Sequence, residues 1–207
     1  LVPDYPGNEN LSGRLSHQVE LPRNIFYTGP LSKFSGAATG ESKINLPYPY
    51  YCLILSGPEP QRSLLFEKVT SALSGIHLVV LSGSPGPRAP ENSDYITVIT
   101  NPDTSTMKQI ITGSSLVISR AGYSTIMELA SLGKGGVIIP TTGQTEQEYL
   151  GRYLNGRHGF ITVKQNDLDR LRDISPLAQG APLACFPDNA ILFEKAVRSL
   201  LEQKIKS

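Results

Sequence analysis

The sequence lacks most of the features that mark a specialised class of protein. Two cysteines in 207 residues, Cys52 and Cys185, are too few for a disulfide framework or a thiolate zinc site. The 19 basic and 18 acidic residues leave a net charge of +1, which argues against a dedicated nucleic-acid binder or a polybasic membrane-surface protein. No apolar run approaches the roughly 20 residues of a membrane span, and no signal-peptide pattern opens the chain. We expect a cytoplasmic protein with two buried, free thiols.

Several catalytic motifs are also missing. The sequence has neither a Walker A loop nor the pattern G-x-G-x-x-G, so neither an ATPase nor a nicotinamide-dependent enzyme is indicated. It has no G-x-S-x-G nucleophile elbow. Its three histidines, His17, His77 and His158, have no Cys, Asp or His at metal-ligand spacing. We therefore expect neither a metal ion nor a cofactor.

Residues 1–49 differ in composition from the rest of the chain. They are rich in Pro, Gly, Ser and Asn, and only residues 24–28 have the pattern of a strand. A structureless stretch of this length is uncommon inside a compact domain, so we predict an irregular arm. The first residue is Leu1 rather than methionine, which leads us to expect a fragment of a longer protein, with the arm as an interdomain linker.

From Tyr50 onwards, short apolar runs alternate with segments of helical periodicity. Such alternation predicts parallel strands joined by crossover helices, which is a doubly wound, Rossmann-like α/β sheet. We expect this domain to span residues 50–186 and a C-terminal helix to occupy 187–207. The expected strands are 51–55, 77–81, 95–100, 115–118, 136–139 and 159–163; the expected helices are 59–74, 103–112, 124–132, 146–155, 166–178 and 189–204.

Ligands of such sheets bind beyond the carboxyl ends of the strands, so the strand-to-helix turns are the candidate sites. The first turn, from Ser56 to Arg62, contains Gly57 and leads into a helix. Free N–H groups and the positive end of the helix dipole suit a phosphate there. Gln61 could add a hydrogen bond and Arg62 a charge. The alternative is a proline-containing helix start in which Gly57 serves only the turn.

The second turn follows the strand at 115–118 and reads SRAGYSTIMELA. Gly122 would let a ligand approach the backbone, and Tyr123, Ser124 and Thr125 begin a helix. Glu128 follows one turn later, where a carboxylate can accept the two hydroxyls of a ribose. The alternative is an ordinary helix start, with Ser124 or Thr125 as the cap and Glu128 completing a capping box.

The third turn follows the strand at 136–139 and reads PTTGQTEQE. Its neutral amides and carboxylates, from Gln144, Glu146 and Gln147, suit sugar hydroxyls better than phosphates. The alternative is again a capping box, between Thr145 and Glu148.

The stretch ISRAGYSTIMELASLGKGGVIIPTTGQTEQEYLGRYL, residues 118–154, resembles the donor-binding half of GT-B glycosyltransferases. It is most similar to the MurG group, the glycosyltransferase family 28 C-terminal domain. The family pattern is R/H-x-G-x-x-T-x-x-E, then Gly-Lys-Pro before a strand, then a proline and an acid- and glutamine-containing helix start. The match is specific over this stretch and extends more loosely over residues 50–165.

The resemblance implies a role for each matching residue. Tyr123, Ser124 and Thr125 would meet the donor diphosphate with Arg120 nearby, and Glu128 would hold the ribose. Gln147, with Glu146 beside it, would read the donor sugar, and residues 101–107 would border the base, expected to be uracil. Two positions depart from the family: Pro58 and Pro60 interrupt the first turn, and Gly135 replaces the usual proline.

GT-B enzymes place the active site between two such domains, and the general base usually comes from the N-terminal one. The resemblance therefore implies that this chain binds a nucleotide sugar, such as UDP-N-acetylglucosamine, but does not transfer the sugar alone. The missing domain would carry the acceptor site and any membrane association, and the last helix would pack toward that domain. Three alternatives remain open: a natural donor-binding subunit of a two-subunit transferase, a UDP-sugar epimerase of the same fold, and a non-catalytic interaction module.

Overall fold

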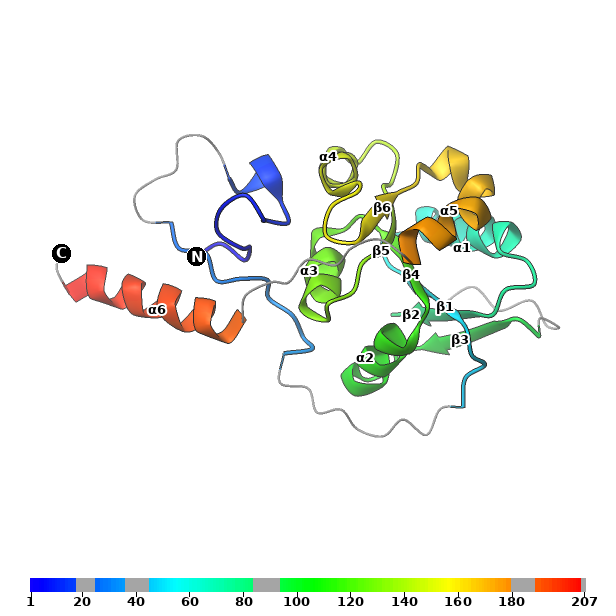
Figure 1. Cartoon of the computed structure of the whole chain (residues 1–207), viewed down its shortest axis with the longest axis horizontal. Helices are drawn as coiled ribbons and strands as arrows, with labels where there is room; N and C mark the ends of the chain where they lie inside the picture. Colours follow the sequence, from blue (N-terminus) through cyan, green and yellow to red (C-terminus); the bar gives the residue numbers. More distant parts are fainter. Residues whose placement is uncertain (18–24, 36–44, 84–93, 180–188, 206–207) are drawn as a thin grey trace.

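The computed structural model describes residues 1–17, 25–35, 45–83, 94–179 and 189–205. Within this part of the chain, a sheet covered by helices on both faces lies beside an irregular arm and a long C-terminal helix (Figure 1). Cys52 is a fully buried free thiol, and burial raises its pKa. Cys185, expected to be buried as well, lies outside the described residues.

The six predicted strands form a single parallel sheet in the order β3-β2-β1-β4-β5-β6. The predicted doubly wound α/β fold is confirmed, and the strand boundaries shift by no more than two residues. The strands are β1 Tyr51–Leu55, β2 Leu78–Ser82, β3 Ile96–Thr100, β4 Leu116–Arg120, β5 Gly136–Ile139 and β6 Phe160–Thr162.

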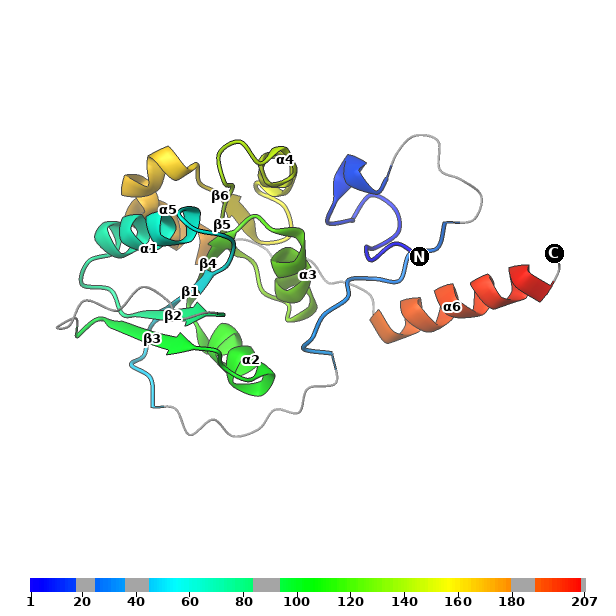
Figure 2. The same cartoon turned by 180° about the vertical axis from the view of Figure 1, so that it is seen from behind.

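The helices cover both faces of the sheet, as Figure 1 and Figure 2 show from opposite sides. One face packs against α2 (Thr104–Gly113), α3 (Tyr123–Ser131) and α4 (Thr145–Leu154). The other face packs against α1 (Gln61–Ala72) and α5 (Leu171–Gln179). Because successive side chains of a strand point to opposite faces, Cys52 enters the first core and Leu53 the second. Burial on both faces explains why these strands are continuous apolar runs.

The helix predicted over residues 166–178 is wrong in its first half. Residues Gln165–Arg170 form a 3-10 helix, η2, and α5 begins only at Leu171. Asp167, with φ −110° and ψ 19°, interrupts the helical backbone. Apolar periodicity does not reveal such a break, because Leu168 and Leu171 are both buried in the same core.

Gly135, which replaces the family's proline, has a packing reason in this fold. A Cβ atom at this position would lie 2.1 Å from the carbonyl oxygen of Gly159. The approach joins the start of β5 to the start of β6, since Gly136 N–H donates to that same carbonyl at 3.0 Å. A side chain at residue 135 would push the two strands apart.

The arm is irregular, as predicted, but the strand expected at 24–28 is wrong over its described residues, 25–28. A single bridge joins Val2 to Tyr27, too short a pairing to form a ladder. The arm is instead organised around the buried carboxylate of Asp4, which accepts hydrogen bonds from Leu11 N at 2.8 Å and Ser12 N at 3.0 Å. A short 3-10 helix, Gly13–Leu15, follows.

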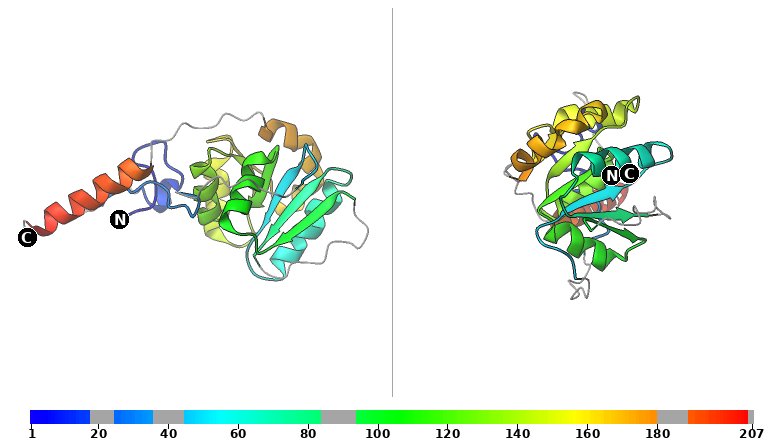
Figure 3. Two further views of the ribbon diagram at one scale, coloured as in Figure 1. Left: turned by 90° about the horizontal axis from the view of Figure 1, so that it is seen from below. Right: turned by 90° about the vertical axis from the view of Figure 1, so that its right-hand side faces the viewer.

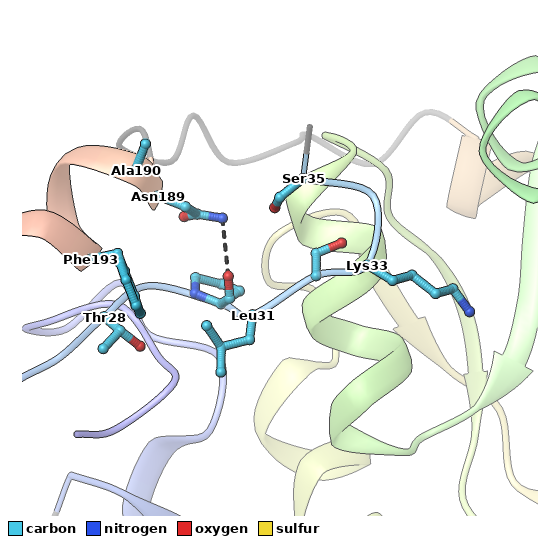
Figure 4. Close-up of a pocket in the computed structure, with 9 residues that line it drawn as sticks. Thr28, Leu31, Lys33, Ser35, Asn189, Ala190 and Phe193 are labelled. Carbon is cyan, nitrogen blue, oxygen red and sulfur yellow. Dashed lines mark hydrogen bonds between the residues drawn. The ribbon is translucent and has the colours of Figure 1, made fainter. Parts of the chain in front are cut away.

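The C-terminal helix α6, Asn189–Ile205, leaves the sheet and extends past the arm (Figure 3). At its start, Asn189 Nδ2 donates to the carbonyl of Pro30 at 3.2 Å. This contact borders a pocket of about 450 Å³ between the arm and α6 (Figure 4). Ile191, Phe193 and Leu201 of α6 are exposed. The division of the chain into arm, domain and terminal helix remains the prediction made from composition.

Candidate functional site

The order of the strands places a topological switch point between β1 and β4, where the ligand crevice of a doubly wound sheet is expected. From β1 the chain proceeds to β2 and β3 on one side of the sheet, then returns to place β4 on the other side of β1. In doubly wound sheets the ligand binds at such a switch point, outside the carboxyl ends of the strands. The turns after β1 and β4 flank this point, and the turn after β5 lies beside them. All three predicted turns therefore lie along one stretch of the sheet edge.

Several polar groups of the first turn bind one another rather than remaining free for a ligand. Gly57 adopts φ 92°, where a side chain would be strained. The guanidinium of Arg62 pairs with Glu59 at 2.8 Å, and the same carboxylate accepts Ser63 N–H at 3.2 Å. Side-chain hydrogen bonds, from Ser63 first and Arg62 second, lower the pKa of Glu59. The charge predicted for a phosphate at Arg62 is thus paired within the turn, while Ser56 and Gly57 are partly or fully open to solvent.

The second turn leaves the start of α3 open. The helix begins at Tyr123 with Gly122 as its N-cap, and no side chain caps it. The first N–H groups of a helix have no partner within the helix, so those of Tyr123, Ser124 and Thr125 are available to a ligand. A capping box from Ser124 or Thr125 to Glu128 is wrong, because both residues already lie inside the helix. Gly122 has open space around it, which lets an anion reach these donors.

The backbone N–H groups of this turn are free for a ligand, whereas two of its side chains contact the arm. The hydroxyl of Tyr123 donates to the carbonyl of Pro3 at 2.8 Å and so anchors the arm, and burial raises its pKa. Glu128, the predicted ribose ligand, lies 3.4 Å from Lys33 Nζ, also in the arm. In Figure 4 the Lys33 side chain points away from the pocket of the arm. The arm therefore contacts α3 at its first residue, Tyr123, and again at Glu128.

Arg120, the last residue of β4, lies between the start of α1 and the start of η2, with only 2% of its surface exposed. Its guanidinium donates to the carbonyl of Gln61 at 2.8 Å and to Gln165 Oε1 at 2.7 Å. Burial lowers its pKa from a very high ordinary value, so it stays charged near neutral pH. Its Nε has no hydrogen-bond partner in the described structure, and no carboxylate there pairs with it. A buried, uncompensated cation favours an anion in the crevice.

The third turn is braced by amide and carboxylate side chains. Gln147 Oε1 accepts Thr141 N–H at 3.0 Å, and its amide group donates to Gln144. Glu148 accepts Gly143 N–H at 2.9 Å. The capping box from Thr145 to Glu148 is wrong, since Gln144 is the N-cap. Glu146 is exposed at the first turn of α4 and has no recorded partner among the described residues.

Two contributions to the site were not foreseen. Gln165 follows β6 and fixes Arg120, and the arm supplies Lys33 and the carbonyl of Pro3. A signal for Gln165 was present, since it follows a strand at the same edge as the three turns. The contacts of the arm could not be read from the sequence, because they join residues about 100 positions apart without any periodic pattern.

The described residues contain no group of three or more His, Cys, Asp or Glu arranged to hold a metal ion. None of the described helices is both long and apolar enough to cross a membrane. The histidines are structural here: His17 stacks on Tyr27, and His158 is buried against the carbonyl of Asn10.

Residues 66–182 match the profile of the glycosyltransferase family 28 C-terminal domain. An uncharacterized glycosyltransferase of Methanosarcina acetivorans is 30% identical over 161 residues, covering 72% of this chain and 38% of the relative. A UDP-N-acetylglucosamine–N-acetylmuramyl-(pentapeptide) pyrophosphoryl-undecaprenol N-acetylglucosamine transferase of Bacillus thuringiensis is 48% identical over 89 residues, covering 41% of this chain and 24% of the relative. The chain thus spans less than half the length of these relatives.

Solved glycosyltransferases share the fold. The spinosyn rhamnosyltransferase SpnG aligns with a TM-score of 0.57 at 15% identity, covering 88% of this chain and 48% of the other. The calicheamicin glycosyltransferase CalG4 aligns with a TM-score of 0.56 at 11% identity, covering 88% and 44%. In both, the alignment covers less than half of the solved chain.

Proposed function

Because the chain belongs to the glycosyltransferase family 28 C-terminal domains, we propose that its crevice binds the nucleoside diphosphate of a sugar-nucleotide donor, UDP-N-acetylglucosamine. The observation that carries this proposal is the open start of α3 at the switch point, where Gly122 leaves three N–H groups without a cap. The positive end of a helix dipole and free N–H groups are complementary to a diphosphate. The choice of sugar is supported by the donor in the name of the 48% identical relative.

Each turn would meet a different part of the donor. The N–H groups of Tyr123, Ser124 and Thr125 would bind the diphosphate, with the charge of Arg120 nearby. Glu128 would accept the ribose hydroxyls after exchanging its contact with Lys33. Gln144, Glu146 and Gln147 would face the donor sugar. Ser56, Gly57 and Gln61 would border the diphosphate from the other side of the crevice, where Arg62 remains paired with Glu59.

The reaction we propose for the whole protein is direct displacement at the anomeric carbon with inversion. The leaving diphosphate would gain negative charge as the glycosidic bond breaks, and fixed N–H donors aimed at it would stabilise that charge without reorganising. The general base and the acceptor site would belong to the part of the protein outside this chain, so the chain alone would bind donor without transferring the sugar. A cytoplasmic location, with any membrane contact made through that other part, belongs to the same proposal.

Titration calorimetry with UDP and UDP-N-acetylglucosamine tests the donor site. We expect the variant Glu128→Ala to bind at least about tenfold more weakly, because a hydrogen bond to a charged group contributes about 1.5–3 kcal/mol and 1.4 kcal/mol is tenfold in affinity. Glu67→Ala is the matched control, since Glu67 is an exposed acid on α1, away from the crevice. Absence of nucleotide binding by the folded wild type, or equal affinity of the two variants, would contradict the proposal.

A further inference from the structure

A second hollow opens at the same edge of the sheet, on the side of α4 that faces β6 and η2. Its volume is about 550 Å³, within the range of about 300–1,000 Å³ typical of small-molecule sites. The turn after β5 separates it from the crevice, and none of the turn residues predicted to meet the donor lines it. Its walls include Thr142, Glu148, Arg152 and Asn155 on one side and Lys164, Gln165 and Asn166 on the other.

The charges around this hollow are unbalanced. Arg152 of α4 and Lys164, which follows β6, both line it. Neither side chain has an ion-pair or hydrogen-bond partner in the described part of the chain. The acid among the lining residues, Glu148, already accepts Gly143 N–H at 2.9 Å. Two basic side chains that line one hollow and have no ion-pair partner among the described residues are suited to bind an anion.

The floor of the hollow adds a fixed donor. Gln165 Oε1 accepts from Arg120 Nη1 at 2.7 Å. Since a guanidinium can only donate, this bond sets the orientation of the Gln165 amide and leaves its NH₂ group for another acceptor. Lys68 Nζ, which donates to the carbonyl of Gln165 at 3.2 Å, brings another positive charge to the same residue. Two basic side chains, Arg120 and Lys68, thus hold Gln165, and two more, Arg152 and Lys164, line the hollow with it.

We propose that this hollow binds a phosphate group at a site separate from the donor crevice. Arg152 and Lys164 supply the charge, and the Gln165 amide supplies a directed hydrogen bond. A phosphate on this site sits on the opposite side of Gln165 from Arg120, so the two anion sites share one positioning residue. The phosphate can belong to a free small molecule or to the headgroup of a lipid, and both present the same group to the hollow.

Titration with inorganic phosphate, followed by NMR of the side-chain amides, tests the site without any nucleotide. We expect the resonances of Gln165 and Asn166 to shift saturably in the wild type, and the apparent affinity to fall at least about tenfold, or 1.4 kcal/mol, in the double variant Arg152→Gln/Lys164→Gln. The matched control, Arg14→Gln/Lys195→Gln, removes the same charge from two exposed positions elsewhere and should bind like the wild type. The site variant should still bind UDP, so failure here is distinct from failure of the donor proposal.

Vesicles of phosphatidylcholine with and without phosphatidylglycerol distinguish the two sources. Sedimentation with the anionic vesicles that the site variant loses and the control variant retains would assign the site to a lipid phosphate. Saturable phosphate binding without sedimentation would assign it to a free small molecule. Equal loss of phosphate binding in both double variants, or no saturable shift of Gln165 and Asn166, would overturn the proposal.

Discussion

The helices α2 and α3 both begin at the carboxyl edge of the sheet, yet their first turns are satisfied in different ways. Asp103 caps α2, and its carboxylate accepts Thr106 N–H at 2.8 Å. Gly122 stands at the same position of α3 and offers no side chain. The strands that lead into them also differ, since β3 ends in the neutral Thr100 and β4 in the buried cation Arg120.

The capped start of α2 stabilises the fold, whereas the uncapped start of α3 is suited to a ligand. An N-cap satisfies one of the free N–H groups and complements the positive dipole end. The first turn of α2 therefore has less to offer an anion, and it lies over the edge strand β3. The first turn of α3 keeps both its donors and its dipole, and it lies over β4, at the switch point. The missing cap is thus expected where a ligand takes its place.

The largest effect on UDP affinity is expected from giving α3 an aspartate N-cap like that of α2. In Gly122→Asp the new carboxylate would cap the helix and place a negative charge where the diphosphate binds. No atom lies within 4 Å of a Cβ at this position, so we expect a folded protein. UDP affinity, measured by calorimetry, should fall by at least about 100-fold, which corresponds to about 2.7 kcal/mol.

Two controls sharpen this test. Gly122→Ala adds a Cβ without an acceptor and should leave UDP affinity within about threefold, or 0.7 kcal/mol, of the wild type. Asp103→Ala opens α2 instead and should lower the thermal midpoint at neutral pH. Because residues 101–107 are expected to border the base largely through backbone groups, removing this side chain should weaken UDP binding far less than Gly122→Asp does. The hydrogen bond from Thr106 lowers the pKa of Asp103, so its stabilising effect is present above its ordinary pKa and is lost as pH falls through the lowered one. The gap in midpoint between wild type and Asp103→Ala should therefore close in acid. A loss of UDP binding in Asp103→Ala as large as that in Gly122→Asp would contradict the contrast between the two helices.

Arg120 gives the next largest effect. Arg120→Met keeps most of the side-chain volume but removes the charge and the bonds to Gln61 and Gln165. The two acceptors that Arg120 leaves behind lose their donor, which costs about 1–3 kcal/mol for a buried group, so the free energy of unfolding should fall by about that amount. UDP affinity should fall about tenfold, since a buried cation near a diphosphate contributes at least 1–2 kcal/mol. Unchanged UDP affinity in a folded variant would show that the charge does not act on the crevice.

The fold could be predicted largely from the sequence because its strands are buried on both faces. Runs such as Leu78–Leu81 and Val137–Ile139 have no solvent side, and the helices between such runs then dictate a parallel sheet. The break at Asp167 could not be predicted, because it interrupts the backbone without changing which side chains are buried. The family profile and the fold of the GT-B structures are in agreement with the resemblance read from residues 118–154.

The candidate site was predictable in position but not in the state of its side chains. The turns followed from the strand ends, and Gly122 and Glu128 from the motif. The pairing of Arg62 with Glu59, and the use of the Tyr123 hydroxyl to hold Pro3, depend on which neighbour is nearest in three dimensions. A sequence motif specifies residue types, whereas these contacts are decided by competition among polar groups for the same partner.

The smallest effect concerns the arm, which contacts α3 through Lys33 and Pro3. Lys33 Nζ lies 3.4 Å from Glu128 Oε1, and its side chain is 44% exposed. An exposed pair of this kind contributes at most about 1 kcal/mol, so Lys33→Ala should change the free energy of unfolding very little. If Glu128 holds the ribose, removing its competitor should strengthen UDP binding by up to about threefold, or 0.7 kcal/mol. Lys195→Ala, an exposed lysine on α6, is the control for the loss of charge alone. Weaker UDP binding in Lys33→Ala would instead mean that the ammonium group attracts the diphosphate, and that the arm adds to the open helix start rather than competing with its ligand.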